Sequence, residues 1–267
     1  MRQVKRFKDD YGEKKRRRAR TRALLILIAI IFALGGFFYF LFLSGKFEVQ
    51  GVNITVPEPL RGDVIKTATD EWLQDRKFGI ARKNNILFLK SDDLSKFLAE
   101  KFPEVKEIEI NKDKNYVLEL FLTKREPEGI WCSDPDCFYF DNEYVVYAQT
   151  VTSSGFVITV IKDYRDNDLK VGDYIESIWV ENSLIAKKEF EEKGILIKEI
   201  QIPKNSNDEF HLIAAEGFSI YMSLFTDIKK QVEALLIAWD EKITEEEKEM
   251  LEYIDLRLPD RIYYKQY

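Results

Sequence analysis

Cys132 and Cys137 are the only two cysteines in the chain, and four residues separate them. Two thiols can contribute to a metal site, act as a redox pair or form a disulfide. A zinc site needs about four ligands, and the single histidine, His211, lies far along the sequence. A redox pair is expected as C-x-x-C, which this spacing is not. Asp134 and Pro135 between the cysteines favour a tight turn.

The choice between a small disulfide loop and two free thiols depends on the compartment. Thiols tend to oxidise outside the cytoplasm and to stay reduced inside it. The chain-entropy model gives a loop of this size about 2 kcal/mol of stabilisation. The membrane topology of the chain therefore decides which state is expected.

Residues 23–43 contain no charged side chain. An apolar helix of about 20 residues matches a hydrocarbon core of roughly 30 Å. A soluble core helix seldom stays apolar on every face for this length. A signal peptide has an apolar stretch of about 7–15 residues before a small-x-small cleavage site, and no clear site of that kind follows here. The sequence predicts an uncleaved transmembrane helix over residues 23–43.

Residues 1–22 carry eleven of the 41 Lys and Arg and three of the 47 Asp and Glu. Short flanks rich in Lys and Arg stay in the cytoplasm, so we expect the amino terminus inside and residues 44–267 outside. The basic run can also bind nucleic acid, but its place beside a span favours orientation and contact with anionic lipid. The remaining 30 basic and 44 acidic residues give the exported part a net charge of −14, which argues against a nucleic-acid surface. An exported location also favours the Cys132–Cys137 disulfide.

The first exported section, residues 44–126, is expected to contain a strand, two helices and a hairpin. In the first helix, Val64, Ala68 and Trp72 are expected on one apolar face. Two helices covering one face of a three-stranded sheet would bury the apolar stripes. These elements are expected at residues 46–54, 60–74, 91–102, 105–110 and 116–122.

The second exported section, residues 127–267, is richer in strands. Thr244 followed by Glu247 is the pattern of a capping box at the start of a helix. The predicted fold class is α+β: a single transmembrane helix, a β-α-α-β-β domain, and a mixed β-rich domain with packed helices. Strands are expected at residues 138–149, 155–164, 195–202, 209–216 and 218–224, helices at 176–194, 227–243 and 244–253, and an extended stretch at 254–267.

Catalytic signals are weak throughout the sequence. The motifs of P-loop, dinucleotide-binding and zinc-protease sites do not occur. His211 lies inside an expected strand, where a structural role is favoured over a catalytic one. Carboxylates such as Glu191 and Glu192 lie on a charged helix face. We therefore predict no enzyme, no catalytic residue, no cofactor and no metal site, with a membrane-anchored envelope hydrolase using His211 as an alternative.

Four segments, together with the basic tail and the anchor, follow one another in a recognisable order: "FEVQGV" at residues 47–52, "NILFLKSDDLSKFLAEKFPEVKEIEI" at 85–110, "REPEGIW" at 125–131 and "YIDLRLPDRIYYK" at 253–265. This order resembles the bacterial cell-division family FtsQ, also called DivIB, over the whole chain. The first two segments resemble the start and second half of a polypeptide-transport-associated (POTRA) domain. The third resembles the junction after that domain, and the fourth the closing D-L-R segment. The chain departs from the family pattern in having Lys124 before the junction Arg and no glycine near Glu143 or Tyr144.

The resemblance implies a cytoplasmic tail (1–22), a transmembrane helix (23–43), a POTRA domain (44–126) and an FtsQ-type β domain (127–267). It implies a non-enzymatic divisome scaffold in the cell (inner) membrane at the division septum. Such a scaffold gathers membrane proteins of the FtsB and FtsL type and helps to control septal peptidoglycan synthesis. In the family the final strand is where the partner docks. A POTRA-type chaperone for exported polypeptides is a further alternative.

The last residues of the chain fit an exposed sheet edge on their own chemistry. An edge strand offers unpaired amide and carbonyl groups that a partner strand can complete, and tyrosines supply interface area. Because side chains alternate, we expect one of Tyr263 and Tyr264 to be buried and the other exposed. A proline at Ile262 or Tyr263 is expected to abolish partner binding and leave the fold intact. The predicted docking residues are Leu258, Arg261, Ile262, Tyr263, Tyr264 and Lys265.

Overall fold

The computed structural model forms a mixed α+β fold with two compact units, Met1–Leu98 with Ile108–Leu122, and Ala99–Glu107 with Thr123–Tyr267. Leu43, the last residue of the expected span, and residues 155–157 of an expected strand lie outside the described residues. The structure describes residues 10–42, 44–77, 81–151, 158–165, 167–241, 243–259 and 261–267.

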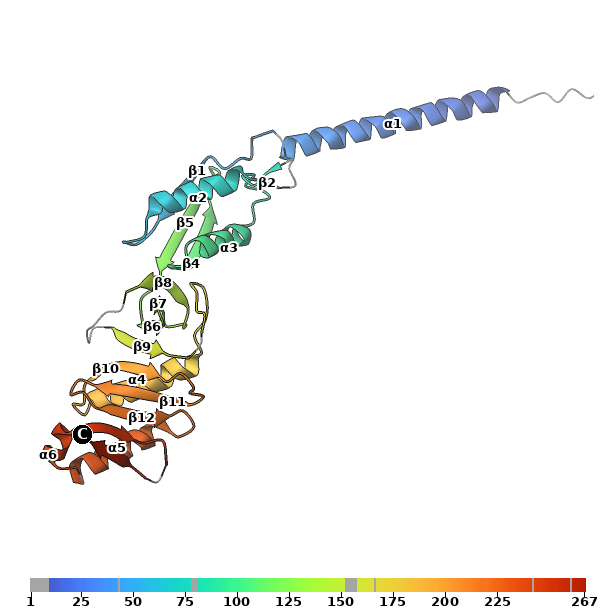
Figure 1. Ribbon diagram of the computed structural model, residues 1–267. Coiled ribbons are helices and arrows are strands. Elements are labelled where there is room, and N and C mark those ends of the chain that lie inside the picture. Colours follow the sequence, from blue (N-terminus) through green and yellow to red (C-terminus); the bar gives the residue numbers. More distant parts are fainter. Residues whose placement is uncertain are drawn as a thin grey trace, which may run out of the picture. The chain divides into compact units, whose positions relative to one another are not determined.

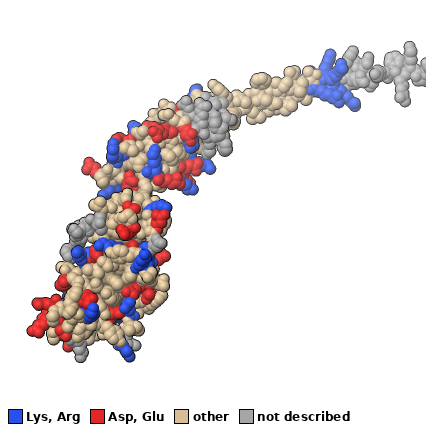
Figure 2. Space-filling model, viewed as in Figure 1, with Lys and Arg blue, Asp and Glu red and all other residues tan. Residues whose placement is uncertain are grey.

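The first unit begins with a long helix, α1 (Asp10–Phe42) (Figure 1). Among the described helices, the segment Lys15–Phe42 is the one long and apolar enough to cross a membrane. Figure 2 shows cationic side chains gathered at one end of this helix and uncharged surface along the rest. The prediction of one apolar, membrane-length helix near the amino terminus is confirmed.

The rest of the first unit is built around a three-stranded sheet in the order β1-β5-β4, with β1 parallel to β5. A ribbon of two short strands lies between the two helices in sequence, and the sequence did not indicate it. The elements are β1 (Gly51–Thr55), α2 (Gly62–Gln74), β2 (Arg76–Lys77), β3 (Ala81–Arg82), α3 (Ser91–Lys101), β4 (Val105–Lys112) and β5 (Val117–Lys124). The end of α3, the start of β4 and the end of β5 are grouped with the second unit.

The buried face of α2 agrees with the predicted one only in part. Ala68 is buried as expected and Trp72 is partly buried, but Val64 is exposed, and the helix also buries Ile65, Thr69 and Leu73. A shift of one residue turns the face of a helix by about 100°, so a stripe read from three residues is easily misplaced.

The second unit contains a nine-stranded sheet in the order β14-β13-β12-β11-β10-β9-β6-β7-β8. Its two edges are therefore β14, at the carboxy terminus, and β8. The strands are β6 (Gly129–Ser133), β7 (Asp136–Phe140), β8 (Val146–Thr150), β9 (Thr159–Asp163), β10 (Ile197–Ile202), β11 (Glu209–Ala214), β12 (Ser219–Ser223), β13 (Leu251–Asp255) and β14 (Tyr263–Gln266).

Two helices, α4 (Ser177–Glu191) and α5 (Ile228–Glu241), pack with one face of this sheet to form its main core. The core includes Phe190 of α4, Leu235 of α5, and Ile200, Leu212 and Ile254 of the sheet, all fully buried. The short helix α6 (Glu245–Glu249) begins with the predicted capping box at Thr244 and Glu247, which is confirmed.

Two sequence-based boundaries in this unit were wrong. Residues 138–149 form two strands rather than one, because the chain turns after Asp141. The Oδ1 atom of Asp141 accepts hydrogen bonds from the backbone N–H of Glu143 and Val145, both at 3.0 Å, and Tyr144 adopts a left-handed φ of 63°. The last helix ends at Glu249, and strand β13 follows at once.

Candidate partner-docking site

Strand β14 is the terminal edge of the nine-stranded sheet and pairs antiparallel with β13. In this pairing Tyr263 lies opposite Asp255, Tyr264 opposite Ile254, and Lys265 opposite Tyr253. Among the described residues, no strand covers the other side of β14. Its outer backbone groups therefore form a free edge.

The identity of the free backbone groups follows from the alternation of the strand. The backbone N–H of Tyr267 donates to the carbonyl of Met250, at 3.0 Å, so Tyr267 faces β13. In an antiparallel pair, alternate residues turn both backbone groups to the same side. Lys265 therefore also faces β13, whereas the N–H and C=O of Tyr264 and Gln266 point away from the sheet. These are the groups that an added strand can bond.

The two tyrosines of β14 lie on opposite faces of the sheet and are both half-exposed. Relative exposure is 47% for Tyr263 and 41% for Tyr264, so the expectation of one buried and one exposed ring was wrong. The hydroxyl of Tyr264 lies 3.5 Å from Oε1 of Glu247 in α6, which places this ring on the helix-covered face. An added strand would therefore meet an aromatic ring on each face.

The other predicted docking residues surround this strand in different settings. Leu258 is exposed, Arg261 is exposed in the segment between β13 and β14, and Ile262 packs against the main core. Lys265 forms an ion pair with Glu252, with Nζ 2.5 Å from Oε2, and this carboxylate raises the pKa of Lys265. The structure thus places Tyr263, Tyr264 and Lys265 on the edge strand. Leu258, Arg261 and Ile262 lie in the segment that leads to it, with Ile262 acting partly as a core residue.

A row of stacked aromatic rings crosses the helix-free face of the sheet towards this edge. The ring of His211 stacks on Tyr221 with centroids 4.0 Å apart, and Tyr221 stacks on Tyr253 with centroids 4.9 Å apart. Lys265 lies opposite Tyr253 in the register and continues the row onto β14. The sequence analysis missed this row. In the sequence these aromatic residues are visible only as members of separate strands. The sequence does not reveal the strand order or the register that stacks them.

Ion pairs of Arg257 lie along one side of this aromatic row. Nη2 of Arg257 lies 2.6 Å from Oδ2 of Asp255, Nη1 lies 2.5 Å from Oε2 of Glu209, and the guanidinium sits 5.5 Å from the centre of the Tyr221 ring. The hydrogen bonds that Arg257 donates to Asp255 and Glu209 raise the pKa of Arg257. Burial alone would raise the pKa of Asp255, but the hydrogen bonds from Arg257 keep that pKa below its usual value.

His211 belongs to the same cluster. Burial lowers the pKa of the ring, and the hydrogen bond with Glu209, at 2.5 Å from Nε2 to Oε1, opposes that shift only in part. The ring is therefore neutral near pH 7. Its contacts with Glu209 and Tyr221 occupy one nitrogen and one face, an arrangement typical of a packed structural histidine.

The hydrolase alternative can be examined at a hollow of about 670 Å³ that both Ser133 and His211 line. These residues lie on β6 and β11, which are separated by three steps in the strand order. At about 4.8 Å per step the separation is roughly 14 Å, far beyond the reach of a hydrogen bond. The hydroxyl of Ser133 donates instead to the carbonyl of Asn167, at 2.6 Å. The hollow does not assemble a nucleophile and a base from this pair.

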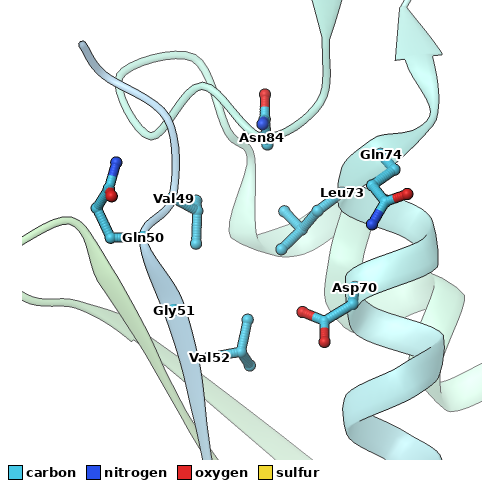
Figure 3. Close-up of a pocket in the computed structure, with 8 residues that line it drawn as sticks. All are labelled: Val49, Gln50, Gly51, Val52, Asp70, Leu73, Gln74 and Asn84. Carbon is cyan, nitrogen blue, oxygen red and sulfur yellow. The ribbon is translucent and has the colours of Figure 1, made fainter. Parts of the chain in front are cut away.

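A second cavity, of about 370 Å³, lies in the first unit between β1 and α2. Figure 3 shows Asp70 and Leu73 of α2 on one side of it and Val49 and Val52 on the other, with Gln50 directed away. Its lining contains one carboxylate and no cationic side chain. It shares no residue with the β14 edge.

Cys132 and Cys137 lie opposite one another on β6 and β7 and form a disulfide. They pack with Ile130 and Val160 in a small cluster separate from the main core. In the strand order, β6 and β7 lie near the β8 edge, far from β14. The disulfide therefore fastens the hairpin and is not part of the docking edge.

Neither metal chemistry nor known relatives add to this site. In the part of the chain that the structure describes, no three His, Cys, Asp or Glu side chains are grouped so that they could hold a metal ion. No family model matches the chain, and no curated protein matches it. The candidate site is accordingly defined by its geometry: a free terminal strand, exposed aromatic rings on both faces, and an ordered aromatic row beside it.

Proposed function

We propose that the protein is a non-enzymatic, membrane-anchored scaffold of bacterial cell division, of the FtsQ or DivIB type. In this proposal β14 accepts a strand from a partner of the FtsB type, alone or together with an FtsL-type protein. The observation that carries the proposal is the free edge of β14, where Tyr264 and Gln266 direct their backbone groups away from the sheet. Strand addition uses such groups for affinity and the flanking side chains for specificity.

The anchor and its charges support the membrane part of the proposal. Helix α1 has a membrane-length apolar segment, and cationic residues precede it. By the positive-inside rule the amino terminus lies in the cytoplasm and residues 44–267, after the span, lie outside it. The net charge of −14 left by the 30 basic and 44 acidic residues after the tail suits an acidic domain in the cell envelope.

The topology of the first unit supports a POTRA domain. Along the chain, β1 is followed by two helices and then by the hairpin β4–β5. In the sheet β5 is the central strand, and β1 pairs parallel to it. The R-x-P junction also has a physical role. Nε of Arg125 donates to the carbonyl of Pro103 at 3.0 Å, and the guanidinium is paired with the buried Asp141.

The proposal is tested by the location of the protein and by its contacts at β14. A fluorescent fusion is expected to form a band at midcell in dividing cells. A photo-crosslinking amino acid at Tyr264 is expected to capture a small FtsB-type membrane protein. The matched control is Tyr174, which is more exposed and bridges to Val145 next to the opposite edge. Fluorescence spread evenly around the membrane, or equal capture from both positions, would contradict the proposal.

A further inference from the structure

The end of α1 is held by a loop of the first unit. The side-chain amide of Asn85 donates to the carbonyl of Leu41, at 2.6 Å. The last four carbonyls of a helix have no partner within the helix, so this bond satisfies one of them. The ring of Phe42 stacks on that of Phe88, with centroids 4.3 Å apart and an angle of 12° between the planes.

This loop is itself fixed by backbone and side-chain bonds. The Lys112 ammonium donates to the carbonyls of Ile86 and Leu89, at 3.2 and 2.6 Å. Ile86 and Leu89 are buried, whereas Leu87 and Phe88 between them are 51% and 47% exposed. Two apolar side chains are thus held outward on a rigid support.

The length of the anchor determines the depth of these side chains relative to the bilayer. Arg22 is the last charged residue before the apolar run, and Phe42 is the twentieth residue after it. Twenty helical residues extend about 30 Å, the thickness of the hydrocarbon core. If the helix enters the core after Arg22, Phe42 lies at the opposite boundary. Phe88 is in ring contact with Phe42 and therefore lies at the same level.

We infer that Leu87 and Phe88 form a membrane-contact platform, which rests in the outer headgroup region where α1 leaves the bilayer. The occupant of this apolar patch is phospholipid, because the patch is continuous with the lipid-facing end of α1. The exposed Lys90 and the nearby Lys46, 5.5 Å from the centre of the Phe40 ring, suit anionic headgroups. The acidic residues near them are Glu48, which forms an isolated β-bridge with Asn85, and Asp92 and Asp93 in the first turn of α3.

With this platform, the anchor would also orient the first unit at the membrane surface. Because the Asn85 bond and the ring stack hold the loop against the end of α1, the rest of the first unit cannot rotate freely about this helix. The inference rests on the membrane-spanning part of the proposed function and does not depend on partner binding at β14.

The test uses the full chain in vesicles of phosphatidylethanolamine and phosphatidylglycerol. A bimane probe is placed on Leu87→Cys, Val64→Cys or Ile30→Cys, and the native disulfide is left oxidised so that it does not react. Val64 is the matched control, because it is an exposed apolar residue of the same unit. It lies ten residues before Gln74, the last residue of α2, which is a distance of about 15 Å along that helix. Quenching by nitroxide-labelled lipids and by aqueous iodide is then compared.

We expect nitroxide lipids to quench the probe at Leu87 several-fold more than the probe at Val64, and iodide to show the reverse order. Equal quenching at Leu87 and Val64 would overturn the platform. Protection of Leu87 from both quenchers would indicate a second copy of the chain on the patch and would also overturn it. The probe at Ile30 separates the two claims: quenching there by lipid nitroxides, together with failure at Leu87, leaves the anchor intact and rejects only the platform.

Discussion

Replacing Tyr264 by proline removes one backbone donor from the free side of β14. The N–H of Tyr264 points away from β13, so the substitution breaks no bond of the sheet. Proline is tolerated on edge strands in this orientation, and it restricts the preceding residue to the extended region that Tyr263 already occupies. We expect the fold to survive and the binding of the strand partner to fail.

The expected loss of affinity follows from one missing hydrogen bond. The net contribution of such a bond is about 0.5–1.5 kcal/mol, and leaving the partner's buried carbonyl unsatisfied costs about 1–3 kcal/mol more. The sum of roughly 1.5–4.5 kcal/mol corresponds to a dissociation constant raised about 10- to 1,600-fold, at 1.4 kcal/mol per factor of ten. The change in the free energy of unfolding should stay below about 1 kcal/mol, since no backbone bond of the sheet is lost and the hydrogen bond from the Tyr264 hydroxyl to Glu247 is long and exposed.

The assay is calorimetric titration of residues 44–267 with the extracytoplasmic region of the proposed FtsB-type partner. Tyr264→Ala is the matched control, because it removes the ring and keeps the N–H. Lys265→Pro is the control for the fold, because its N–H faces β13 and its loss should cost about 1–3 kcal/mol of stability. Equal affinities of Tyr264→Pro and Tyr264→Ala would refute the reasoning, since the backbone donor would then contribute nothing.

Three further predictions concern stability. Gly129→Ala should lower the free energy of unfolding by about 1–3 kcal/mol, because an added Cβ would lie 2.5 Å from Cζ of the buried Phe140; an unchanged denaturation midpoint would count against this packing. Replacing Cys132 and Cys137 by serine should cost about 2 kcal/mol in the same denaturation assay, and equal stability with the oxidised wild type would show that the disulfide contributes nothing. Burial lowers the folded-state pKa of His211 below 6.5, so its contribution to stability is present above pH 6.5 and is lost as the pH falls through the lower folded value. His211→Gln should remove this part of the pH dependence of thermal unfolding, and an unaltered profile would contradict the burial of the ring.

The sequence was sufficient for the long apolar helix, the capping box and the position of most strands. These features depend on local composition and periodicity, which are visible in one chain. The free edge at β14 depends instead on the order of nine strands. The sequence suggested a proline at Ile262 or Tyr263, but only the register shows that Tyr263 faces β13 and that Tyr264 carries the free donor.

The turn after Asp141 shows why some boundaries escape a sequence reading. The family that the sequence resembles has a glycine near the positions of Glu143 and Tyr144. Because this chain has none there, the sequence did not indicate the turn. The structure makes the turn with Asp141, whose carboxylate accepts two backbone N–H bonds, and it places Tyr144 in the left-handed region that glycine usually occupies. The side chain of Tyr144 packs against the core and donates to Glu181 at 3.0 Å, which offsets the strain.

The most direct test of partner docking at β14 is amide hydrogen exchange, measured residue by residue by NMR with and without the proposed FtsB-type partner. In the free protein, the amides of Tyr264 and Gln266 should exchange fast and that of Lys265 slowly, because only Lys265 donates within the sheet. On binding, exchange at Tyr264 and Gln266 should slow markedly while Lys265 changes little. Unaltered exchange at Tyr264 and Gln266 in a saturated complex would show that the partner binds elsewhere and would contradict the account.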